Sequence, residues 1–271
     1  MKQRFASFSA VSLALALAGC AELNQDPGPD PGVEEVHSLL TSENGLSTAN
    51  GLSTANGLST ANGLSTANGL STANGLSSTT GMMTTDAGRT TISYLVRCAL
   101  RANTSIVKKD QYGTSYTFTG EAGLAPEWAT GNCNNDCQER ISACLLAHVN
   151  TAGVHIPLWI VAQDATVGWT LSPDYPNQEG SFFGNMFQKG AHGTDAAKVP
   201  MYYCNGVAYD VDTVPGRIGA AQVGAPYYNP FPGTGYCKDS CTVADKPYQT
   251  SGFKACDGWN HVVTVWRKNA Q

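Results

Sequence analysis

Nine cysteines are the residues of this chain whose number and spacing most clearly predict a chemistry. Eight of them follow residue 86, and an even number of cysteines in an exported chain indicates disulfide bonds. Two Cys-x₃-Cys pairs, at 133–137 and 237–241, also resemble the spacing of zinc ligands. The first 18 residues have the positive start and apolar stretch of an export signal, and an exported protein meets oxidants before it meets zinc. We therefore expect four disulfides, whose pairing the sequence leaves open. The eight residues are Cys98, Cys133, Cys137, Cys144, Cys204, Cys237, Cys241 and Cys256.

Histidines and carboxylates offer weaker candidates for acid–base or metal chemistry. His192 and Asp195 could form a metal pair, or a base with the acid that orients it. His261 begins an apolar segment after a polar turn. Asp210 and Asp212 would point to the same side of an extended segment, where they could bind a hard cation such as calcium. Solvated loop and turn residues explain the same patterns, so we assign no catalytic or metal-binding residue.

Four further titratable residues have predictable surroundings. His148 and His155 fall among apolar neighbours, where a core histidine satisfied by a hydrogen bond is expected. Glu121 and Glu127 flank a Gly-Leu-Ala-Pro turn, and either could act as a general acid only if buried near a partner carboxylate. The chain contains no Gly-x-Ser-x-Gly, His-Glu-x-x-His or P-loop motif, so the signatures of common serine hydrolases, zinc proteases and P-loop nucleoside triphosphatases are missing from its sequence.

Aromatic side chains among Gly, Pro and Asn give a hint of binding in the C-terminal half. Flat rings in polar loops stack on sugars or contact protein partners in many extracellular modules. Filling of the core explains a large share of such rings equally well. The residues in question are Trp169, Tyr175, Tyr202, Tyr203, Tyr227, Tyr228, Tyr236 and Trp259.

The N-terminus reads as an export signal. Lys2 and Arg4 form a short positive region, and an apolar Ala- and Leu-rich segment at 5–18 follows. The Leu17-Ala18-Gly19-Cys20 sequence resembles the lipobox of bacterial lipoproteins. That resemblance implies a signal peptide at 1–19, lipidation of Cys20 and, because Ala21 rather than Asp follows, sorting to the outer membrane. An ordinary secreted protein with an incidental cysteine is the alternative.

Residues 20–85 are expected to form a tether. The stretch contains acidic residues but no Lys or Arg, and from Asn44 the unit Asn-Gly-Leu-Ser-Thr-Ala repeats five times, with a decaying sixth copy ending the repeat region 44–76. One leucine per six residues buries too little apolar surface to offset backbone ordering, which favours a flexible, low-complexity spacer. A β-helix built from the hexads is the alternative.

The folded domain is expected at 86–271. Apolar residues recur at helical spacing from Ile92 to Leu100, behind a cap at Thr85 or Asp86. A second helix is capped by Asn134 or Asn135 and ends near 151–153. Cys98 and Cys144 lie on or beside the inward-facing stripes of these helices, which would allow a disulfide between the two helices.

Strand-like segments dominate the rest of the chain. Together with the early helices they predict an α+β fold, with two N-terminal helices packed on a mainly antiparallel sheet or sandwich and stapled by disulfides. The expected strands are 105–108, 112–120, 154–162, 181–187, 201–204, 207–214 and 261–266.

Four short segments resemble a group of exported myxobacterial proteins with no assigned activity. They are Cys-Ala-Leu at 98–100, Gly-Leu-Ala-Pro-Glu-Trp at 123–128, Ala-Cys-Leu-Leu-Ala-His-Val-Asn at 143–150 and Glu-Gly-Ser-Phe-Phe-Gly-Asn at 179–185. The resemblance covers residues 90–271 and implies an exported bacterial setting.

Charge and hydropathy exclude two classes. The net charge is −5 and the folded part is close to neutral, so no basic surface for nucleic acid is expected. No apolar run after the signal region is long enough for a polytopic membrane protein.

We therefore expect a cell-envelope lipoprotein, held in the outer membrane by its N-terminal lipid, that presents a binding or envelope-structural domain to a carbohydrate or protein. We expect no cofactor. An envelope hydrolase acting on polysaccharide or peptide, with His192, Asp195 or His261 in its site, is the alternative. A stalk whose hexads are themselves functional is a third possibility.

Overall fold

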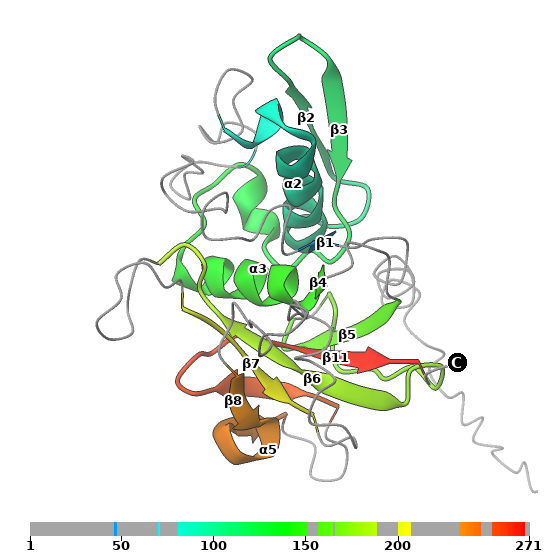
Figure 1. Cartoon of the computed structure of the whole chain (residues 1–271), viewed down its shortest axis with the longest axis vertical. Helices are drawn as coiled ribbons and strands as arrows, with labels where there is room; N and C mark the ends of the chain where they lie inside the picture. Colours follow the sequence, from blue (N-terminus) through cyan, green and yellow to red (C-terminus); the bar gives the residue numbers. More distant parts are fainter. Residues whose placement is uncertain are drawn as a thin grey trace, which may run out of the picture. The chain divides into compact units, whose positions relative to one another are not determined.

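The computed structural model of the chain (Figure 1) describes residues 46–47, 70, 81–150, 157–164, 166–188, 200–206, 233–244 and 251–268. These residues belong to one compact unit, Pro31–Gln271. The predicted signal peptide, Cys20 and most of the repeats lie outside the described residues.

Helix α2, Asp86–Ala99, forms where its sequence predicts. The Thr85 hydroxyl caps the helix by accepting a hydrogen bond from the Gly88 N–H at 3.1 Å. Its predicted apolar face is buried, as are Met82 and Met83 in the 3₁₀ helix η3, Met82–Thr84, which precedes it. The core of the domain therefore begins before Asp86.

Helix α3, Asn135–Ala147, is capped by Asn134, whose side-chain oxygen accepts a hydrogen bond from the Cys137 N–H at 3.0 Å. It ends at Ala147, earlier than the predicted stretch at 151–153, and His148 is its C-terminal cap. The helix lies across one face of the main sheet, where it packs on strands β6, Asn177–Gly184, and β11, Val262–Arg267 (Figure 1).

The main sheet has five strands in the order β5-β11-β6-β7-β8. Strand β5 is Leu158–Ala162, β7 is Met201–Asn205 and β8 is Gly233–Tyr236. All neighbours pair antiparallel except β7 and β8, which are parallel. The predicted α+β class with a mainly antiparallel sheet is thus confirmed.

Helix α2 packs on α3, on η3 and on the hairpin of β2, Ser105–Lys109, and β3, Ser115–Thr119. The hairpin and α2 lie together at one end of the domain in Figure 1. The two helices therefore form a layer in which α3 makes the main contact with the sheet, while α2 packs chiefly on α3 and the hairpin.

Both faces of the main sheet are covered. Phe182 and Val263 belong to the large core cluster that includes α2 and α3, whereas their neighbours Phe183 and Val262 belong to a smaller cluster on the opposite face. Successive side chains of a strand point to opposite faces, so adjacent buried residues require two covering layers. The second layer contains the hairpin of β9, Cys241–Val243, and β10, Phe253–Cys256, with the short helix α5, Cys237–Ser240.

Two short elements complete the described chain. The 3₁₀ helix η4, Pro126–Ala129, carries the buried Trp128. Strand β1, Leu46–Ser47, in the first hexad repeat, pairs in parallel with β4, Val149–Asn150. The strand predicted at 207–214 and the first residues of the one predicted at 154–162 lie outside the described residues.

Candidate functional site

All eight predicted disulfide cysteines are paired. The bonds are Cys98–Cys144, Cys133–Cys137, Cys204–Cys237 and Cys241–Cys256. The first joins α2 to α3, as their inward-facing positions suggested. Two groups of residues bring possible metal-ligand atoms close together. One is Cys98, Cys144 and His148, and the other is Cys204, Cys237 and Cys241. Their sulfurs are in disulfides, so they offer no thiolate to a metal ion.

Several candidates lie outside the described residues. These are Cys20, His155, His192, Asp195, Asp210, Asp212, Tyr227 and Tyr228. Of the candidates within the described residues, His261 has the most informative surroundings.

His261 immediately precedes β11, which begins one residue later than the sequence predicts, and faces the first turns of α3. Its Nε2 lies 3.5 Å from Oδ1 of Asp136. Asp136, Glu139 and Arg140 share one face of α3 because they are spaced by three and four residues. The buried Glu139 accepts a hydrogen bond from the Asn260 N–H through Oε2, at 3.2 Å. This bond fixes the turn before β11 against the helix.

The pKa of the Glu139 carboxyl is raised above its ordinary value. Burial is the main cause, and Asp136 adds to it. The Asn260 N–H and the nearby His261 partly oppose the rise. Glu139 thus prefers the protonated form more than a solvated glutamate does.

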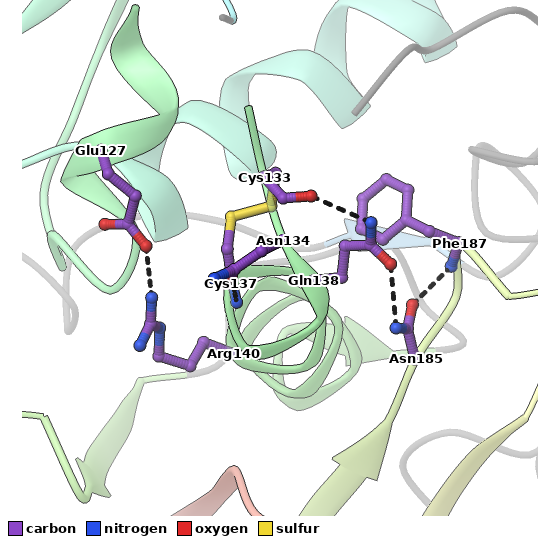
Figure 2. The surroundings of a disulfide bond; sticks show 8 residues. All are labelled: Glu127, Cys133, Asn134, Cys137, Gln138, Arg140, Asn185 and Phe187. Atoms are coloured by element: carbon purple, nitrogen blue, oxygen red, sulfur yellow. Dashed lines mark hydrogen bonds and ion pairs between the residues drawn. A yellow bond between two sulfur atoms is a disulfide. The ribbon is translucent and has the colours of Figure 1, made fainter. Parts of the chain in front are cut away.

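A disulfide and a small hydrogen-bond network hold the start of α3 (Figure 2). The Cys133–Cys137 bond closes the segment that precedes the helix, and the Gln138 amide donates to the Cys133 carbonyl at 3.0 Å. The Asn185 amide donates to the Gln138 side-chain oxygen at 3.0 Å, and this contact ties the helix to the end of β6. Asp136, Glu139 and Arg140 therefore project from a fixed helix end.

A shallow depression lies beside His261. Arg140, Asp164 and His261 supply its charged and titratable groups, and Leu124, Val262 and Val263 contribute to its apolar wall. Arg140 also forms an ion pair with Glu127 (Figure 2). The depression has a volume of about 10 Å³, which is room for about one water molecule, so it does not enclose a sugar ring or a peptide.

Glu121 and Glu127 do not meet the condition for a general acid set out above. Glu121 lies 3.2 Å from Nε of Arg97, and burial, opposed by that guanidinium, raises the pKa of Glu121. Glu127 is paired with Arg140. Each carboxylate thus has an arginine partner, which is typical of a structural ion pair.

His148 has the hydrogen bond expected of it. Its Nδ1 lies 2.8 Å from the carbonyl oxygen of Cys144, and its ring lies 5.5 Å from that of Tyr94. It is half-buried at the end of α3.

Six of the eight predicted aromatic residues lie within the described part of the chain, and their exposure differs. Trp169 is half-buried and Tyr236 is exposed. Tyr175 and Tyr203 are buried, which confirms core filling for these two. Tyr202 and Trp259 are half-buried, with ring centroids 6.4 Å apart, and Tyr202 also stacks on Phe183 at 5.9 Å. Trp259 immediately precedes Asn260 and His261, which contact α3, whereas Tyr202 belongs to β7.

Candidate site residues that the sequence did not single out are Glu139 and Arg140. Their spacing with Asp136 on one turn of a helix was visible, but it describes ordinary solvated helix faces equally well. Glu139 is distinguished by its hydrogen bond with Asn260, more than a hundred positions later in the chain, and Arg140 by its place beside His261 in the lining of the depression.

Comparisons with known proteins give no family for this chain. No family model, no curated protein and no solved structure matches it. Within the described residues, no helix combines the length and the hydropathy that crossing a bilayer requires.

Proposed function

We propose that this chain is an outer-membrane lipoprotein that displays a disulfide-bonded binding or envelope-structural domain on a tether. The observation that supports this proposal most is the pairing of all eight cysteines after residue 86. Disulfides persist in oxidising compartments, and the export signal and the lipobox-like sequence before Cys20 agree with such an address.

The anchor is tested in cells that carry the full chain. Labelled palmitate should enter the protein, and the protein should partition into the detergent phase. Cys20→Ser should abolish both, because several acyl chains at one residue give stable membrane attachment that no described element replaces. An unlabelled wild-type protein in the aqueous phase would overturn the lipoprotein assignment.

The pair of Tyr202 and Trp259 is the surface that best suits a carbohydrate or protein ligand. Half-exposed rings provide stacking area at little conformational cost. We expect Tyr202→Ala and Trp259→Ala to reduce sedimentation of the protein with envelope polysaccharide. Tyr112→Ala is the matched control, since Tyr112 is 85% exposed on the distant β2–β3 turn. Equal loss in all three variants would remove the surface from consideration.

One observation favours the second candidate, an envelope hydrolase. A histidine and a carboxylate come together where His261 meets Asp136, beside a depression that fits about one water molecule. Purified protein should then release fragments from cell-wall polysaccharide or peptide, and His261→Ala should abolish the release. If wild type and variant are equally inactive on both polymers, the hydrolase is rejected and the binding function stands.

A further inference from the structure

One repeat leucine is part of the core of the folded domain. Leu70 has no solvent-exposed surface and belongs to the same cluster as Met83, Ile92 and Trp128. Its backbone N–H donates a hydrogen bond to the carbonyl oxygen of Trp128 in η4, at 2.8 Å. Both the side chain and the backbone of this residue are therefore held by the domain.

Leu70 occupies the third position of the fifth perfect Asn-Gly-Leu-Ser-Thr-Ala copy. Leu46 occupies the same position of the first copy, and its backbone pairs with Val149 in the β1–β4 contact. The same hexad position thus contacts the domain at two places. A spacer whose only role was to provide length would not need contacts between its leucine position and the domain.

We propose that the folded domain carries a binding site for the Asn-Gly-Leu-Ser-Thr-Ala hexad, and that other copies can take the position that Leu70 fills. The ligand is a short, uncharged peptide whose leucine enters the core and whose backbone N–H bonds to Trp128. The neighbouring copy that contains Leu64 has the same sequence, so it offers the same leucine and the same backbone donor.

The chain length makes such an exchange inexpensive. Leu70 precedes Met82 by twelve residues and Leu64 precedes it by eighteen. The entropic cost of closing a loop grows as three halves of the logarithm of its length. The equilibrium constant for docking Leu64 is therefore about twofold smaller than that for docking Leu70. Loss of a buried leucine with no substitute lowers the folding equilibrium constant by about a hundredfold or more.

This exchange would adjust the tether, a consequence that rests on the proposed function. Each step from one copy to the preceding one moves six residues from the anchor side to the domain side of the docked position. At about 3.3–3.6 Å per residue, one step shortens the extended reach between anchor and domain by roughly 20 Å. The site itself needs no anchor, so its test is independent of lipidation.

The first experiment measures unfolding of the full chain under non-reducing conditions. Leu70→Ala should lower the folding equilibrium constant only about twofold, because Leu64 replaces it. Changing all six repeat leucines to alanine (residues 46, 52, 58, 64, 70 and 76) should lower it by about a hundredfold or more. Leu124→Ala is the matched control, since Leu124 is a buried leucine of the same core with no copy elsewhere, and it should cause the large loss alone. A hundredfold loss, or failure to fold, for Leu70→Ala by itself would overturn the exchange.

The second experiment follows hydrogen exchange at the repeat amides. In the wild type, the amide of residue 70 should be protected through its bond to Trp128. In Leu70→Ala, protection should move to the amide of residue 64. A synthetic peptide of three hexads, added to the variant without repeat leucines, should restore stability as its concentration rises. Absence of protection at residue 64 and of rescue by the peptide would refute the binding site, whereas loss of palmitate labelling would bear only on the anchor.

Discussion

The four disulfides should differ in their contribution to stability, and the loops that they close predict the order. Cys98–Cys144 joins residues 46 positions apart, and Cys133–Cys137 joins residues four positions apart. A cross-link stabilises mainly by removing conformations from the unfolded chain, so its contribution grows with the logarithm of the loop. The relation gives about 4 kcal/mol for the longer loop and about 2 kcal/mol for the shorter one.

Packing does not separate the two pairs. Cys98 and Cys144 between α2 and α3 have no exposed surface, and Cys133 and Cys137 are buried as well, so replacement by alanine leaves unfilled space in both double variants. Cys133 and Cys137 close the start of α3, where the Asn134 cap and the Gln138 hydrogen bond remain when the bond is removed. From the loop lengths we therefore expect the free energy of unfolding to fall by about 2 kcal/mol more in Cys98→Ala/Cys144→Ala than in Cys133→Ala/Cys137→Ala.

Guanidinium unfolding of both double variants, followed by circular dichroism without reductant, measures this difference. The slope of the transition must be compared as well, because loss of a cross-link expands the unfolded state. Equal losses in the two variants, or a larger loss for the short loop, would refute the reasoning from chain entropy.

Three further predictions concern single residues. In Cys256→Ser, disulfide mapping by mass spectrometry should find some protein with a Cys204–Cys241 bond. The two sulfurs lie only 3.5 Å apart, and the freed Cys241 can attack the neighbouring Cys204–Cys237 bridge. Finding Cys204 bonded to Cys237 in all of the protein would contradict this. Glu139→Gln should raise stability at about pH 8 and leave it unchanged at about pH 4. Because the pKa of Glu139 is raised in the folded state, the wild type has its full stability below the ordinary pKa of 4.5 and loses some of it as the pH rises through the folded-state pKa, whereas glutamine stays neutral. Denaturation at both pH values checks the sign. If the chain is lipidated at Cys20 as proposed, Ala21→Asp should move it to the inner membrane in fractionated cells, and unchanged fractionation would oppose the sorting expectation.

The helices could be predicted from the sequence because their signals are local. Thr85 and Asn134 supply the caps, and the buried positions between Ile92 and Ala99 recur at helical spacing. Strand β6 begins at Asn177, earlier than predicted. Because its first residues are polar, the sequence pattern did not indicate them as part of the strand. Glu179 is buried there with Arg267 3.4 Å away, a partner from the far end of the chain that no local pattern reveals.

The candidate site was less accessible to such reasoning. His261 was identified as a titratable residue at the start of the predicted strand 261–266, but its contact with Asp136 depends on packing between α3 and β11. The repeats show the same limit. The low apolar content of a hexad predicts a spacer, and for the residues outside the described part this stays a prediction. The burial of Leu70 depends instead on a site that the domain provides.

The disulfides also explain how the second layer of the sheet is held. The cluster on that face contains few apolar side chains, among them Phe183, Phe253 and Val262, which is a small area with which to hold α5 and the β9–β10 hairpin. Cys204–Cys237 ties α5 to the sheet, and Cys241–Cys256 closes the hairpin. Tyr202, Cys241 and Trp259 pack on this cluster. Reduction would therefore loosen the layer on which the proposed binding surface rests, so that surface should keep its shape only where the bridges stay oxidised, outside the cytosol.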